Sequence, residues 1–504
     1  MISTFSLRPR SGRRAASQVG RGALCLAALA LLPVAGEPLA AQEARTLTLQ
    51  QAIEIAQRNG LTAQAALSSR DAARERDRAY GARLLPQISL SGNVPSYNRS
   101  IIQAPQPDGS TLFRPQQQTN SDLSMVLLQQ LPLTGGTLRM SSRIAQLKRT
   151  GESATETWNS TPFSVTLTQP ILRSNSIGWD NRANALSADV AERQYLEARE
   201  DVALQTATAF FDYYAAQLSL RNAEANTAVN DTLYRLNQGR YEVGKIAEND
   251  LLQSELQLLR ARTSLDGSRL EHDRAKAALR LALNLAPDEP LEITVTTEVP
   301  EFAADTAQAV AQALRNRSQI MDLELQATTA DRRVSEARWN GGVGATLNAT
   351  YGYNATAPEM NEAYRDLQQA QQLTLNVQVP ILQWGARSAD REAAQLERQR
   401  VQSSSRATRE QIAQEAHFAA LQLSQARRLL QIAAKADTVA AKRYEVAYNR
   451  YLIGVIDVDA LFLAQNEKDQ ALISFIQALR GYWQAHYRLR RLTLFDFERG
   501  VRIQ

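Results

Sequence analysis

The side chains that could perform catalysis are scattered through this sequence. The three histidines, His272, His417 and His486, have no second metal-ligating residue three or four positions further on, the spacing that places two ligands on one helix face. No glycine-rich phosphate loop follows a predicted strand, and the carboxylates alternate with Lys and Arg as on solvated helices. We therefore expect surface histidines and predict no enzyme, no metal site and no cofactor.

A second group of polar residues belongs to a motif that occurs twice, 210 residues apart. Its two copies are Arg240-Tyr241-x-x-Gly244-x-Ile246 and Arg450-Tyr451-x-x-Gly454-x-Ile456. Acidic residues follow both copies: Asp250 after the first, and Asp457 and Asp459 after the second. A glycine in the left-handed conformation commonly ends a helix, and Asp is favourable in the first turn of the next helix. The motif therefore predicts a turn between two helices.

The elements around this motif are also duplicated. Pro170-Ile171-Leu172 recurs as Pro380-Ile381-Leu382 at the same offset. Residues 179–238 and 386–453 contain neither Gly nor Pro, and they predict helices on the order of 90–100 Å long. Returning helices are expected at about 246–285 and 457–495, and shorter ones at about 48–82 and 305–338. Helices of this length must pack side by side, as a coiled coil or a helical barrel.

Between the short and long helices lie segments in which apolar and small polar residues alternate. The pattern covers about 86–171 in the first half and about 343–381 in the second. In the second half the apolar positions are Val343, Ala345, Leu347, Ala349, Tyr351 and Tyr353, then Leu373, Leu375, Val377, Val379 and Ile381. Such alternation is typical of transmembrane strands around an aqueous lumen, although a soluble β-sandwich alternates in the same way.

The first half has about 47 extra residues before Pro170, and they contain two further alternating segments near 121–146. Alternation of Leu138 and Met140 with Arg139 favours a place in the same sheet. Val126 and Leu128 interrupt the polar face of the other segment and disfavour it. Both alternatives stay open at this stage.

Charge and hydropathy limit the class of protein. Residues 1–41 combine five arginines with an apolar run and end in Ala40-Ala41, which predicts a secretory signal peptide. The remaining residues include 52 basic and 51 acidic ones, and this balance argues against nucleic-acid binding. The only cysteine, Cys25, lies in this segment. No later stretch is apolar for long enough to form a membrane-spanning helix.

The order of these features resembles the TolC-like outer membrane efflux protein family. Residues Leu47 to Ile53 are similar to the usual start of the family. Residues 167–172 resemble its strand-to-helix junction at Pro170, and Pro380 is the counterpart in the second half. Residues 240–250 resemble its hairpin tip. The resemblance implies a homotrimer in a Gram-negative-type outer membrane. Four strands per protomer would give a shared, lipid-facing β-barrel of about 12 strands. The helical hairpins would form a periplasmic α-barrel continuous with it.

The resemblance also implies partners and sites. The tips would close the tunnel and dock a periplasmic membrane fusion (adaptor) protein of an inner-membrane transporter, either a resistance–nodulation–division (RND) pump or an ABC exporter. Acidic residues near the tips can form a gating ring. Asp250 occupies the position where the family commonly has an acidic residue. At the corresponding position of the second half the residue is Ala460, with Asp457 and Asp459 close by. These acids could form a charged ring or simply begin a helix, and both alternatives stay open.

We therefore expect a mixed, mainly α, fold with two internal repeats. Residues 42–300 would form the first, with its tip near 244. Residues 301–495 would form the second, with its tip near 454, and 496–504 would be a tail. The predicted function is a passive outer-membrane duct. The alternative from another class is a periplasmic coiled-coil tether without a pore.

Overall fold

A computed structural model describes residues 46–107, 109–151, 154–286, 289–296, 299–302 and 304–503. The predicted signal peptide lies outside the described residues. Within the described part of the chain, no helix combines the length and the hydropathy needed to cross a membrane.

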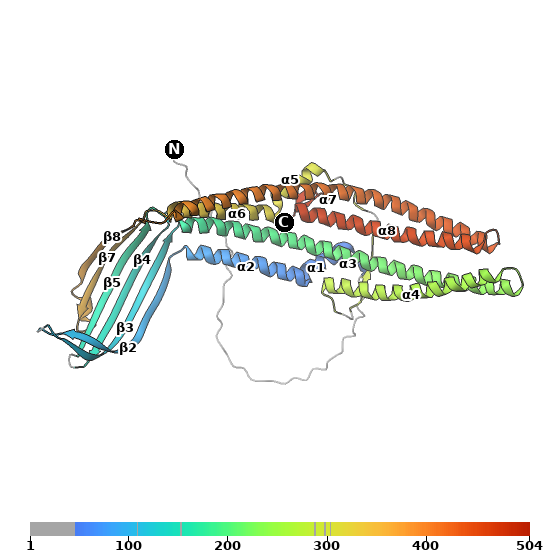
Figure 1. The fold of residues 1–504 in the computed structure, drawn as a ribbon. Coiled ribbons are helices and arrows are strands. Elements are labelled where there is room, and N and C mark those ends of the chain that lie inside the picture. Colours follow the sequence, from blue (N-terminus) through green and yellow to red (C-terminus); the bar gives the residue numbers. More distant parts are fainter. Residues whose placement is uncertain are drawn as a thin grey trace, which may run out of the picture. The chain divides into compact units, whose positions relative to one another are not determined.

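Four long helices dominate the described chain (Figure 1). Helices α3 (Ser176–Glu242) and α7 (Ala386–Leu452) have 67 residues each, about 100 Å at the rise of an α-helix. Each turns back into a 36-residue helix, α4 (Glu248–Leu283) after α3 and α8 (Val458–Thr493) after α7. The chain therefore contains two helical hairpins of matching dimensions.

The shorter helices differ from the sequence-based expectation, because each predicted segment is divided in two. Helices α1 (Leu49–Asn59) and α2 (Leu61–Arg83) meet at Gly60, and α5 (Thr306–Asn316) and α6 (Ser318–Trp339) meet at Arg317. Both linking residues have an extended backbone, because their ψ angles are 138° and 140° rather than helical. A β-carbon at Gly60 would lie 2.4 Å from the Ala56 carbonyl oxygen, so this break requires glycine.

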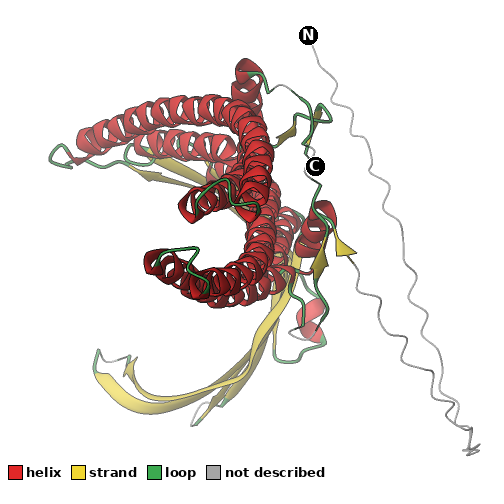
Figure 2. Cartoon of the chain, turned by 90° about the vertical axis from the view of Figure 1, so that its right-hand side faces the viewer, coloured by secondary structure: helices red, strands yellow, loops and turns green. Residues whose placement is uncertain are grey.

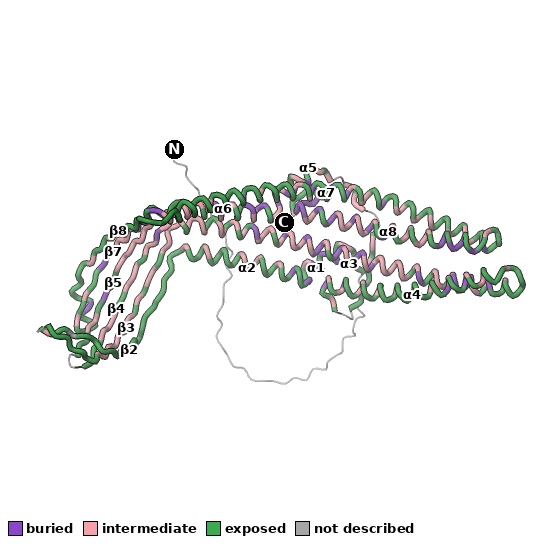
Figure 3. Tube along the Cα trace, viewed as in Figure 1, coloured by how far each residue is buried: buried purple, intermediate pink, exposed green. Residues whose placement is uncertain are grey.

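The two hairpins pack against each other through α3 and α8, which gives the lateral order α4–α3–α8–α7 (Figures 1 and 2). The main apolar core lies where these helices meet the short ones. Its largest buried side chains include Phe210, Phe211, Leu279, Leu479 and Tyr482. Burial in Figure 3 is concentrated along the helices, whereas the strands are mostly intermediate or exposed.

Six strands form one antiparallel sheet in the order β2-β3-β4-β5-β7-β8. Their bounds are β2 (Gln87–Pro105), β3 (Thr111–Leu131), β4 (Gly136–Thr150), β5 (Thr155–Pro170), β7 (Gly344–Ala357) and β8 (Gln368–Gln378). A short helix, η1 (Glu362–Tyr364), lies between the last two. Two small pairs complete the fold: parallel β1 (Thr46–Leu47) with β6 (Glu292–Ile293), and antiparallel β9 (Phe495–Asp496) with β10 (Val501–Arg502).

The extra segments of the first half are strands β3 and β4, and they belong to this sheet. They pair continuously from Gln117–Thr150 to Leu131–Gly136. Their turn is fixed by Gly135 at φ 74° and by Asn175, whose side-chain nitrogen donates to the Pro132 carbonyl oxygen at 2.7 Å. The chain therefore contributes six strands to this sheet, whereas the resemblance implies four, and Val126 and Leu128 do not disturb the pairing.

Candidate functional site: the sheet and the helical tips

One face of the sheet is apolar across all six strands. The register aligns Leu90 with Met125 between β2 and β3, and it continues from Leu127 through Met140 and Val165. We call this surface the apolar face. Its members in the sheet centre are Ile88, Leu90, Met125, Leu127, Leu138, Met140, Val165, Leu167, Leu347, Ala349, Leu373 and Leu375.

Many side chains of the apolar face have no cover in the single chain. Ile88 is 70% exposed, Leu90 66% and Leu373 76%. Water-soluble monomers rarely expose a continuous apolar surface of this extent, so something apolar must cover it.

The opposite, polar face carries mainly hydroxyl and amide side chains. Thr166 and Thr350 are joined through their hydroxyl oxygens at 3.1 Å, and Thr168 donates to the Asn348 side-chain oxygen at 3.1 Å. Apolar residues also occur on it: Val126 pairs with Ser141, Leu128 with Arg139, and Leu147 with Asn120. A sheet with one apolar and one hydrated face can separate lipid from water.

Aromatic residues lie toward both ends of the apolar band. Tyr97, Phe163 and Tyr353 lie toward the connecting loops and are 62%, 46% and 36% exposed. At the helical end, Trp384 follows β8 and is 89% exposed. Aromatic girdles at the two lipid–water boundaries are a property of transmembrane strands.

The sheet ends at the predicted junctions with the long helices. Pro170 is the last residue of β5, and Pro380 follows the end of β8 by two residues. Asn175 caps α3 by accepting a 2.9 Å hydrogen bond from the Gly178 amide. The same side chain holds the β3–β4 turn, so the extra hairpin is attached at the strand-to-helix junction.

Each long helix ends in the turn that the repeated motif predicts. Gly244 and Gly454 have φ of 71° and 74°. The Gly244 amide donates to the Tyr241 carbonyl oxygen at 2.8 Å, and the Gly454 amide to that of Tyr451 at 3.0 Å. A second bond closes each turn, from Lys245 to the Arg240 carbonyl and from Val455 to that of Arg450. Both glycines therefore adopt the left-handed conformation that ends a helix.

A cavity of about 400 Å³ between the two tips collects most of the predicted tip residues. Its lining includes Arg240, Lys245, Ile246, Asp250, Tyr451, Gly454, Ile456 and Asp457. Tyr241, Gly244, Arg450 and Asp459 do not line it. The two halves of the motif therefore meet in space, although they are 210 residues apart.

The three acidic residues have different roles within one chain. Asp457 caps α8 by accepting from the Ala460 amide at 2.9 Å. The carboxylate of Asp459 accepts from the Gln253 side chain. Asp250 lies in the first turn of α4. The ion pairs among the described residues involve none of the three acids.

A family model described as outer membrane efflux protein matches residues 127–285, from β3 to the end of the first hairpin. Over this stretch the chain is similar to outer membrane efflux proteins. This confirms the resemblance drawn from the sequence motifs. No curated protein matches the chain.

Solved channel structures share the fold of this chain. The Campylobacter jejuni CmeC outer membrane channel has a TM-score of 0.65 at 16% identity, covering 90% of this chain and 86% of that one. VceC, an outer membrane protein of Vibrio cholerae, has a TM-score of 0.61 at 15% identity, covering 90% and 97%. The Neisseria gonorrhoeae MtrE outer membrane channel, crystallised in its open state, has a TM-score of 0.62 at 14% identity, with 90% of each chain covered.

The structure corrects one expectation about the histidines. His417 is exposed, but His486 is only 3% exposed and lies among Phe302, Trp483 and Tyr487. Its burial lowers the pKa of the imidazole to about 4. Among the described residues, no cluster of His, Cys, Asp and Glu could hold a metal ion.

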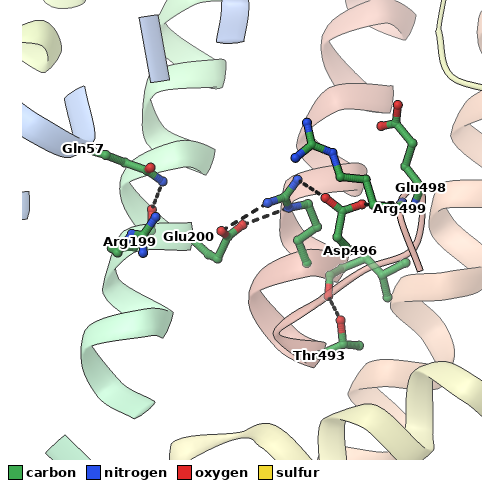
Figure 4. Close-up of polar contacts among 9 residues, drawn as sticks. Gln57, Arg199, Glu200, Thr493, Asp496, Glu498 and Arg499 are labelled. Atoms are coloured by element: carbon green, nitrogen blue, oxygen red, sulfur yellow. Dashed lines mark hydrogen bonds and ion pairs between the residues drawn. The ribbon is translucent and has the colours of Figure 1, made fainter. Parts of the chain in front are cut away.

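A buried ion-pair network lies near His486. Figure 4 shows two of its members, Glu200 and Asp496. The Arg490 guanidinium donates to Glu200 on α3 and to Asp496 on β9, with both shortest contacts at 3.1 Å. Both acids are under 10% exposed. The network fixes the C-terminal strand pair to the helices. It was not predicted, because residues 290 positions apart in the sequence give no local signal.

Proposed function

We propose that this protein is the outer-membrane duct of a tripartite efflux or type I secretion system. It conducts cargo passively, without catalytic chemistry of its own, from an inner-membrane pump across the periplasm and the outer membrane. The observation that carries this proposal is the apolar face, which continues across six strands and has a hydroxyl-lined face behind it. Lipid is the cover that such a surface requires.

The sheet must be completed by other copies of the chain. Strands β2 and β8 each have a single neighbour, so two edges of the described sheet are open. Unpaired backbone groups are not tolerated in lipid, and a closed barrel removes them. Three copies, the number that the family implies, would supply about 18 strands from six per chain. Barrels of this size leave an aqueous channel.

The outer helices of each chain also require partners. Leu252, Leu256 and Leu259 form an exposed apolar stripe on α4. On α7, Ile432, Val439 and Val446 are exposed at heptad spacing. Because α4 and α7 flank the group of four long helices, contact between α4 of one copy and α7 of the next would cover both stripes. The same ring of copies that closes the sheet would thus form a helical barrel.

The paired tips would dock the periplasmic adaptor protein of an RND or ABC transporter. The supporting observation is that both helix-ending turns have the same hydrogen bonds and lie around one cavity. Helix tips bury little surface per contact, so docking would depend on the shape of each turn.

Membrane fractionation and bilayer recording test the duct. The full chain, expressed with its leader, should occur in the outer-membrane fraction as a heat-modifiable trimer, and the purified trimer should conduct ions across planar bilayers. A soluble periplasmic monomer without conductance would support the tether instead and would overturn this proposal.

A further inference from the structure

The charged residues of the polar face come from only two of the six strands. In the described strands β2, β5, β7 and β8, the positions that face this way carry no charged side chain. Strands β3 and β4 alone place charges there. These are Arg114, Asp122, Arg139, Arg143 and Arg149. The hairpin that exceeds the expected strand number therefore also determines the charge of this face, which carries four arginines against one aspartate.

Arg139 is the arginine nearest the helical end of the sheet. It pairs in register with Leu128 on β3 and with Thr166 on β5, and the row continues to Thr350 on β7. Its side chain is exposed, and the ion pairs among the described residues do not include it. Leu128 offers no acceptor, and the Thr166 hydroxyl is already paired with Thr350. The guanidinium therefore keeps its donors available to the solvent.

Arg143 lies four residues further along β4, on the same face. Its Nη2 atom is 3.6 Å from Oδ2 of Asp122, and its side chain is 52% exposed. The other carboxylate oxygen of Asp122 accepts from the Asn93 side chain at 3.1 Å. Asp122 is only 14% exposed, but the separation of 3.6 Å is longer than a hydrogen bond. Asp122 therefore orients Arg143 and leaves much of the guanidinium facing water.

We propose that Arg139 and Arg143 form a cationic ring in the lumen of the outer-membrane section, which makes this section selective for anionic cargo. The inference rests on the proposed duct and names the substrate class that it favours. In a trimer each arginine would occur three times at one level. Charges of one sign around an aqueous passage raise the local concentration of counter-ions, and rings of Arg select anions in pores.

Ion selectivity in planar bilayers tests the ring. The reversal potential of the purified trimer in a KCl gradient gives the chloride-to-potassium permeability ratio. We expect the Arg139→Gln/Arg143→Gln double variant to lower this ratio by at least about twofold. The matched control is Arg99→Gln, which removes one positive charge from β2 at a position on the apolar side. An unchanged ratio in a conducting double variant would overturn the inference. A wild-type trimer that does not conduct would overturn the proposed duct itself.

A chemical probe tests the charge around the two arginines without replacing them, so this test does not depend on whether the double variant assembles. Ser141 lies on β4 between the two arginines and faces the same side. In the mature chain, which has no cysteine once residues 1–41 are removed, Ser141→Cys provides a single thiol. It should react several-fold faster with an anionic methanethiosulfonate reagent than with a cationic one, relative to the same ratio for a free thiol. Equal normalised rates would contradict a cationic environment.

Discussion

The hydroxyl group of Tyr451 donates a 2.7 Å hydrogen bond to the side-chain oxygen of Asn237, and both residues are buried. The bond joins the tip of the second hairpin to the first. The guanidinium of Arg240 lies 5.2 Å from the centre of the same tyrosine ring. The corresponding Tyr241 of the first motif is 42% exposed. In a closed ring of copies, Tyr241 would meet the second hairpin of the next chain.

Removing the Tyr451 hydroxyl should loosen the tip. Tyr451→Phe leaves the buried Asn237 oxygen without its donor, which costs about 1–3 kcal/mol. We expect faster amide hydrogen exchange in 237–250 and 450–458, measured by mass spectrometry on the purified protein. Tyr241→Phe is the matched control, because its hydroxyl has no bond within the chain's described hydrogen-bond network. Equal exchange in Tyr451→Phe and wild type would show that the bond does not hold the tip.

The tip glycines should matter for their backbone conformation alone. A β-carbon at Gly244 or Gly454 would meet no atom within 4 Å, so the effect of a side chain is confined to the strained positive φ. Replacing both by Val should cost on the order of 1–3 kcal/mol at each turn and weaken adaptor binding while the trimer persists.

Site-specific cross-linking to the adaptor measures this effect. Gly239→Val is the control, because Gly239 also has open space around it but lies within α3 without a positive φ. Wild-type cross-linking in the Gly244→Val/Gly454→Val double variant would exclude the turns as docking elements.

Removing the negative charges at the tip distinguishes two roles of the acidic residues, gating the channel and capping the helices. Asn caps a helix as well as Asp does, so Asp457→Asn preserves the bond to the Ala460 amide and removes only the charge. Combined with Asp250→Asn and Asp459→Asn, it should raise single-channel conductance or weaken block by divalent cations. If both quantities equal those of the wild type, the acids act only in the helix termini and the constriction lies elsewhere.

Local patterns predicted the parts of the structure that depend on local physics. Helices without Gly or Pro form where expected, and Gly244 and Gly454 have the positive φ that ends a helix. The position of β3–β4 was undecided, because the Val126 and Leu128 side chains obscured the period of two. The register resolves it by pairing them with Ser141 and Arg139.

Features that depend on tertiary contacts could not be predicted from the sequence. The break at Arg317 lacks a glycine signal, and Glu197 on α3 makes it favourable by accepting from the amide and the hydroxyl of Ser318 at 2.7 and 2.8 Å. The burial of His486 likewise arises from packing of α8 against other elements. Its helical position alone is compatible with a surface residue.

His486 should make the protein less stable as the pH falls from about 6.5 to 4. Burial, and to a lesser extent the nearby positive charge of Arg490, lowers the imidazole pKa to about 4, and Asp496 opposes this only in part. Because the unfolded chain then binds the proton more readily, the free energy of unfolding should fall by about 1.4 kcal/mol per pH unit inside this window. Above pH 6.5 the imidazole is neutral in both states and contributes no slope.

Thermal unfolding of the purified protein between pH 7.5 and 4 measures this effect. His486→Phe keeps an aromatic ring among Phe302, Trp483 and Tyr487 and removes the titrating group, so its melting temperature should decline less over the same range. His417→Phe changes an exposed histidine and should retain the wild-type slope. A His486→Phe variant with the full wild-type slope would assign the acid sensitivity to other groups, such as the carboxylates that pair with Arg490.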